Sequence, residues 1–75
     1  MNKNQFLKSL CKGLSKLVKT ERDKYINDYD EIISDMVENG MTEEEAVENQ
    51  GDIEEIIKNI IENTDKNLLL KKDII

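Results

Sequence analysis

The side chains in this chain that could perform chemistry are carboxylates and a single thiol. There are 17 Asp and Glu residues, one cysteine and no histidine. Zinc sites and Cys-His nucleophiles need histidine or further cysteines, so the composition excludes both. Cys11 lies one helical turn from Leu7 and Leu14. We therefore expect its side chain to be buried as a small apolar group rather than exposed as a reactive thiol.

Four carboxylates in the middle of the chain recur at helical spacing. They are Asp28, Glu31, Asp35 and Glu38. Calcium loops alternate acids around a glycine turn, whereas acids at this spacing point outward from a continuous helix without closing around an ion. Glycosidase-type catalysis needs two carboxylates in a shaped cleft, and a helical chain of 75 residues offers little cleft. We therefore expect no enzyme activity, no metal and no cofactor, and we interpret the row as a solvated helix face.

The charge distribution argues against a nucleic-acid partner. Residues 1–19 contain five lysines and no acid, whereas residues 20–65 contain 16 acids and three basic residues. The segment 52–59, DIEEIIKN, could be the second helix of a helix-turn-helix, but it carries three acids in its first turn and would repel phosphates. The basic beginning of the chain can instead pair with the acidic middle of its own or another chain.

Capping motifs define the elements in the second half of the chain. Thr42 and Glu45 fit a capping box, and Asp52 with Glu55 fits a second one. Gly51 between them supplies the left-handed residue that ends a helix. This block predicts a short helix, a stop and the start of another helix.

The short helix, over 43–50, is barely two turns and must be held by packing of Ala46 and Val47, with Met41 positioned to form a hydrophobic staple to Ala46. The following helix runs from residue 53 to about residue 64. Its apolar stripe consists of Ile53, Ile56, Ile57, Ile60 and Ile61.

Two longer helices precede this block. The first is predicted from Lys3 to about Val18 and capped by Asn2 and Gln5, and Gly13 weakens its interior, with an end near Gly13 as the alternative. Its apolar face holds Phe6, Leu7, Leu10, Cys11, Leu14 and Leu17, and its outer face holds lysines 8, 12, 16 and 19.

The second helix is predicted from a cap at Thr20, with Asp23 three residues on, to Asn39. Tyr25 and Tyr29 lie one turn apart on it, and we expect both at the edge of the core with wet hydroxyls.

The composition favours an all-α fold. Leu, Ile, Val and Phe make up 21 of the 75 residues, proline and tryptophan are absent, and 37% of the residues are charged. We predict a small bundle of three main helices plus one short helix before the last, formed by residues 1–65. The predicted core is Phe6, Leu7, Leu10, Leu14, Ile26, Tyr29, Ile33, Met36, Val47, Ile53, Ile56, Ile57 and Ile60.

Residues 66–75 form an apolar and basic tail that we interpret as a helix extension, a short fifth helix or a linker. Leu68, Leu69 and Leu70 are too apolar to leave in water, so they cover the core, pair with another chain or lead into a further segment. No signal peptide or membrane-spanning run is evident, and one cysteine fits a reducing compartment. We expect a cytoplasmic chain.

Three groups of residues resemble the HAAS-type signalling-domain family over about residues 1–64. They are the opening MNKNQFLKSL; Tyr25, Tyr29 and Asp30; and the hinge residues Gly40, Thr42, Glu43, Glu44, Glu45, Gly51 and Asp52. The chain departs from the family at Val18 and Ile53, where prolines are common, and at Asn49 and Gln50, where an apolar residue is common.

The resemblance implies a small helical cytoplasmic module of bacteria, without catalysis, that often precedes membrane-spanning segments and is often associated with PadR-like transcription regulators. The implied partner is a PadR-like regulator or a membrane protein. Membrane contact would then be indirect, at the inner face, or through a segment outside this chain.

Our leading hypothesis is therefore an intracellular protein-interaction module of a signalling system. The alternatives are a membrane-surface module that uses the lysines of the first helix and the tail, and a structural dimerisation unit that forms a homodimer. The candidate partner-binding residues are those least needed by the core: Asp28, Glu31, Asp35, Leu68, Leu69 and Leu70.

Overall fold

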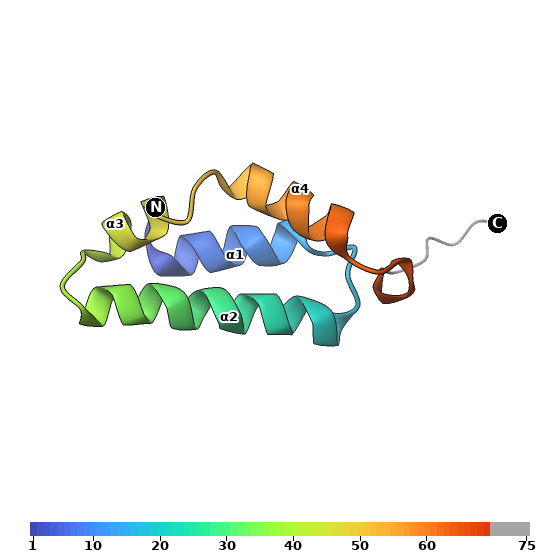
Figure 1. Cartoon of the computed structure of the whole chain (residues 1–75), viewed down its shortest axis with the longest axis horizontal. Helices are drawn as coiled ribbons and strands as arrows, with labels where there is room; N and C mark the ends of the chain where they lie inside the picture. Colours follow the sequence, from blue (N-terminus) through green and yellow to red (C-terminus); the bar gives the residue numbers. More distant parts are fainter. Residues whose placement is uncertain (70–75) are drawn as a thin grey trace.

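The computed structural model describes residues 1–69 and shows an all-α bundle (Figure 1). Its elements are α1 (Lys3–Gly13), α2 (Lys19–Glu38), α3 (Glu43–Glu48), α4 (Ile53–Asn63) and the 3-10 turn η1 (Lys66–Leu68). The predicted arrangement of three main helices plus one short helix before the last is confirmed. Leu70 of the predicted tail site lies outside the described residues.

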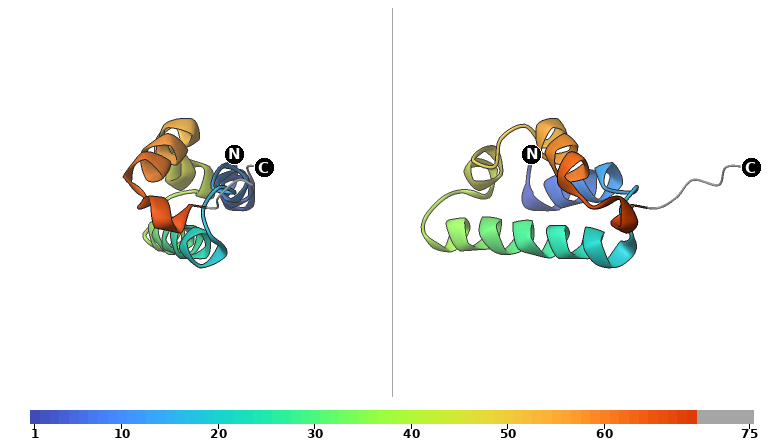
Figure 2. Two further views of the ribbon diagram at one scale, coloured as in Figure 1. Left: turned by 90° about the vertical axis from the view of Figure 1, so that its right-hand side faces the viewer. Right: turned by 45° about the vertical axis from the view of Figure 1, so that its right-hand side comes forward.

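Helix α1 is the central element of the bundle. It packs against α2, α3 and α4, and α2 packs in addition against α3. Viewed along the bundle, α1, α2 and α4 occupy the corners of a triangle (Figure 2). The buried core consists of Phe6, Leu10, Leu14, Leu17, Ile33, Ala46, Val47 and Ile60. Every residue of the predicted core belongs to this cluster or packs against it, and Leu17 and Ala46 complete it.

The first helix ends at Gly13, so the predicted extension to Val18 was wrong and the alternative end near Gly13 is confirmed. Gly13 lies against α4, where an added Cβ would stand 2.8 Å from Cγ1 and 3.2 Å from Cγ2 of Ile57. Its φ is not positive, so this glycine provides space for a close helix contact rather than a left-handed turn. The residues that follow turn away, yet Leu14 and Leu17 remain fully buried.

Helix α2 begins differently from the prediction. The expected cap at Thr20 was wrong, because Val18 is the N-cap and makes no side-chain hydrogen bond. The backbone N–H of Val18 instead donates to the carbonyl oxygen of Leu68 at 2.8 Å, and Leu17 forms an isolated antiparallel bridge with Leu69. A contact from the far end of the chain therefore holds the start of α2.

The hinge around α3 follows the predicted capping chemistry in most respects. The Thr42–Glu45 capping box is confirmed, with Glu45 N–H donating to Thr42 Oγ1 at 3.1 Å. Asp52 caps α4, but its carboxylate accepts from the N–H of Glu54 at 3.1 Å, so the predicted box with Glu55 was wrong.

Backbone geometry explains how the chain reverses on either side of α3. Gly40 and Gly51 have φ values of 109° and 96°, the left-handed region that ends a helix. Met41 is 38% exposed and does not belong to the core cluster, so the staple expected between Met41 and Ala46 is not seen. The hinge is thus held by its caps and by burial of Ala46 and Val47.

Candidate interaction surface

The outer side of α2 carries the acidic residues predicted to bind a partner. We call Asp28, Glu31, Asp35 and Glu38 the acidic face, and all four are exposed. They recur at three- or four-residue steps, which places them in one row opposite the side that packs on α1 and α3. Ile32, beside this row, is 41% exposed. The structure therefore presents an acidic helical surface with an apolar residue along it.

The acidic face takes no part in the ion pairs seen among residues 1–69. These pairs are Lys3–Asp30, with Nζ and Oδ1 3.0 Å apart, and Lys19–Asp23, with Nζ and Oδ2 2.9 Å apart. In the sequence, no basic residue occurs between Lys24 and Lys58. Among the described residues, the acidic face therefore has no basic side chain paired with it.

The row does not gather around a common point. Within the described part of the chain, no three Asp, Glu or Cys side chains approach one another closely enough to hold a metal ion. Successive helical residues advance by about 1.5 Å along the axis, so the carboxylates are spread along α2. The geometry is that of an extended surface rather than a chelating site.

The tyrosines of α2 fasten this helix to α1. Both are half-buried at the edge of the core, as predicted. The rings of Tyr29 and Phe6 lie 5.7 Å apart between centroids and are tilted by 57°, a favourable aromatic arrangement. Burial raises the pKa of the Tyr29 hydroxyl, and the nearby Tyr25 and Asp28 raise it further.

Lys3 connects the beginning of α1 to two other helices. Its Nζ contacts Asp30 and also donates to Ser34 Oγ at 3.3 Å, both on α2. Its backbone N–H donates to Glu43 Oε1 of α3 at 2.7 Å. Asp30 and Glu43 are therefore engaged in holding the bundle together, which distinguishes them from the acidic face. The pairing of the basic beginning of the chain with its own acidic middle was predicted, but the individual partners were not, because they lie 27 and 40 residues away from Lys3.

Cys11 is exposed, so its predicted burial was wrong. It is rotated by about 100° from its buried neighbour Leu10, which turns it toward the lysine side of α1. Lys8 and Lys12 flank it and are also exposed.

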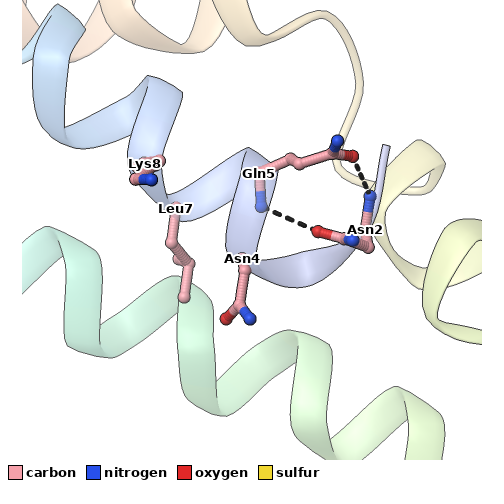
Figure 3. Close-up of a pocket in the computed structure, with 5 residues that line it drawn as sticks. All are labelled: Asn2, Asn4, Gln5, Leu7 and Lys8. Carbon is pink, nitrogen blue, oxygen red and sulfur yellow. Dashed lines mark hydrogen bonds between the residues drawn. The ribbon is translucent and has the colours of Figure 1, made fainter.

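A surface pocket of about 490 Å³ lies along the first turns of α1 and was not predicted. It is lined by Asn2, Asn4, Gln5, Leu7 and Lys8 (Figure 3). The side chains of Asn2 and Gln5 are occupied by the capping box that starts α1. Figure 3 shows Asn4 and Leu7 directed toward α2. The pocket contains no pair of reactive groups that could perform catalysis.

Comparison with known proteins identifies a family. The model of the HAAS family matches residues 5–59, from the first turn of α1 into the middle of α4. The chain belongs to the HAAS family. No curated protein and no solved structure matched it.

The HAAS match includes the acidic face and the hinge, and it ends before η1. Leu68 and Leu69 of the predicted tail site are half-buried, and Leu69 packs against the core. In this HAAS domain the described part of the tail is therefore engaged by its own bundle. None of the helices within residues 1–69 is long and apolar enough to cross a membrane.

Proposed function

We propose that this HAAS domain is a non-catalytic, cytoplasmic protein-interaction module of a bacterial signalling system. Its partner would be a PadR-like regulator or a membrane-associated regulatory protein. The observation that carries the proposal is the acidic face of α2, which is exposed and has no ion-pair partner among residues 1–69. Membership of the HAAS family supports the signalling context.

The acidic face suits recognition of a basic protein surface for two physical reasons. It lies on a 20-residue helix that packs against α1 and α3, so its carboxylates are held in a defined row before binding. Complementary charge also steers association and selects the partner, even where each exposed ion pair adds little affinity. Ile32 adds apolar contact area beside the charges.

The test compares two charge-reversed variants that change the net charge equally. Asp28→Lys/Asp35→Lys alters the acidic face, whereas Glu48→Lys/Glu62→Lys alters exposed residues at or near the ends of α3 and α4. Lysine is tolerated near a helix C-terminus because it complements the helix dipole. Calorimetric titration would measure the affinity for PadR-like regulators encoded in the same genome.

We expect the α2 variant to bind at least about tenfold more weakly and the control variant to bind within about threefold of wild type. Equal weakening by both variants would show that only net charge matters and would remove the assignment to α2. Absence of binding to every such regulator would refute this partner class.

A membrane-surface role is the second candidate, favoured by the exposed side chains of Lys8 and Lys12 on α1 and of Lys16 in the turn that follows it. These side chains would attract anionic lipid in a salt-sensitive manner. Co-sedimentation with anionic vesicles at low and high salt tests it, with Lys8→Ala/Lys12→Ala/Lys16→Ala as the comparison. Sedimentation that does not differ between the two proteins would eliminate this role.

A further inference from the structure

The segment 64–69 returns from α4 to the connection between α1 and α2. Val18 N–H donates to Leu68 O at 2.8 Å, and Leu17 and Leu69 form an antiparallel bridge. Leu17 is completely buried although it lies outside any helix. The segment therefore covers one end of the bundle.

This contact takes the place of one half of a capping box at the start of α2. Val18 is the N-cap residue, with φ −63° and ψ 152°, and it has no side-chain cap. In α1 and α3 the N–H of the N-cap residue donates to the side chain of the third helical residue, Gln5 or Glu45. The beginning of the longest helix thus depends on a segment that follows the last helix.

The segment is fastened more lightly than the helices are. Its other hydrogen bonds are local. Thr64 donates to the end of α4, from its N–H to Ile61 O and from its hydroxyl to Ile60 O, and the remaining bonds lie within the segment, from Leu68 N–H to Asp65 O, from Leu69 N–H to Lys66 O and from Asn67 N–H to Asp65 Oδ1. It contributes no fully buried residue to the core, and Leu69 is only partly buried against it. Regions with few buried apolar contacts open at lower free energy than the core does.

We propose that residues 64–69 form a strap that opens as a separate unit while the four-helix bundle stays folded. Opening exposes Leu17 and removes the contact that holds the start of α2. A molecule that binds or pulls the chain beyond Leu69 therefore acts on α2, the helix that carries the acidic face. The strap lies beyond the end of the HAAS match at residue 59. Its opening can be measured without any partner of the acidic face, so this inference does not depend on the proposed function.

Two substitutions in the full chain weaken the strap by different routes. Val18→Pro removes the N–H that donates to Leu68, and proline accepts the φ of −63° already present at this position. Leu69→Ala shortens the side chain that packs against the core. Lys66→Ala is the matched control, because Lys66 is an exposed residue of the same segment.

Amide hydrogen exchange measured by NMR separates local from global opening. In Leu69→Ala, we expect the Val18 amide to exchange about tenfold faster and the Ile33 amide, in the middle of α2, to change by less than about threefold. In Val18→Pro, the Leu69 amide should exchange faster with the same small change at Ile33. Lys66→Ala should leave all three amides close to wild type.

Two results would overturn the proposal. Equal acceleration at Val18 and Ile33 in Leu69→Ala would show that the strap opens only with the whole bundle. Unchanged exchange at Val18 in Leu69→Ala, or at Leu69 in Val18→Pro, would show that these contacts do not hold the segment closed.

Discussion

Replacing Gly13 by alanine should destabilise the bundle through a single contact between α1 and α4. A Cβ at this position would lie 2.8 Å from Cγ1 and 3.2 Å from Cγ2 of Ile57, closer than carbon atoms normally approach. Ile57 is β-branched and lies within α4, so its χ1 has one strongly preferred rotamer and the side chain cannot simply swing away. The two helices must separate or Ile57 must adopt a strained rotamer.

The magnitude follows from two opposing effects. Overpacking of a filled contact costs about 1–3 kcal/mol. Alanine is favoured over glycine by up to about 1 kcal/mol inside a helix, and by less at Gly13 because it is the last residue of α1. We therefore expect Gly13→Ala to lower the free energy of unfolding by about 1–2 kcal/mol.

A double-mutant cycle with Ile57→Ala isolates the contact. Full burial of an isoleucine makes truncation cost about 2–5 kcal/mol, so the half-buried Ile57 should cost about 1–2 kcal/mol. In the double variant the alanine Cβ no longer meets the Ile57 side chain. The double variant should thus be about 1–2 kcal/mol more stable than the sum of the single effects predicts.

Urea unfolding monitored by circular dichroism measures these differences, with equal m-values required for the comparison. Gly40→Ala is the matched control, since Gly40 has φ 109° and no atom within 4 Å of an added Cβ. Its cost comes from backbone strain alone, and it should add to Ile57→Ala without coupling. A Gly13→Ala variant as stable as wild type, with additive behaviour toward Ile57→Ala, would refute the close contact of α1 and α4.

Three further predictions concern individual side chains. Thr42→Ala should cost about 0.5–2 kcal/mol of stability in urea unfolding. Hydrogen bonds from the backbone and side chain of Thr42 lower the pKa of Glu45, so this stabilisation is present above the unfolded pKa and is lost as pH falls through the lower folded value. Thr42→Ala keeps the backbone hydrogen bond and removes only the side-chain one, so the pKa of Glu45 should rise while staying below its ordinary value; an NMR titration that finds it at or above that value would contradict this account. Burial raises the pKa of the Tyr29 hydroxyl above its usual value of about 10. The stability that the neutral hydroxyl contributes is therefore lost as the pH rises through the pKa of the folded state. An alkaline titration that finds the pKa of Tyr29 at or below about 10 would contradict this prediction. Cys11 should react with a thiol reagent in the folded chain at nearly the rate seen in urea, and strong protection would contradict its exposure.

Much of the fold was predictable because its signals are local. The capping boxes at Asn2 and Thr42 each involve residues three positions apart, and the glycines at 40 and 51 end helices through their own backbone conformation. The apolar periodicity also identified which residues form or border the core. The position of the acidic face followed from the same periodicity, since residues opposite a buried stripe point into solvent.

The four helices, the caps at Asn2 and Thr42 and most of the buried positions could be read from the sequence, because these signals lie within one helical turn. The packed fold was needed to establish where α1 ends, where α2 begins and which acidic side chains are engaged. Gly13 meets Ile57, Val18 meets Leu68, and Lys3 meets both Asp30 and Glu43, across separations that no helical periodicity encodes. Such contacts depend on how the packed helices bring distant residues together. The folded chain therefore had to show that residues 64–69 form a strap, and that Asp30 and Glu43 hold the bundle together whereas the acidic face does not.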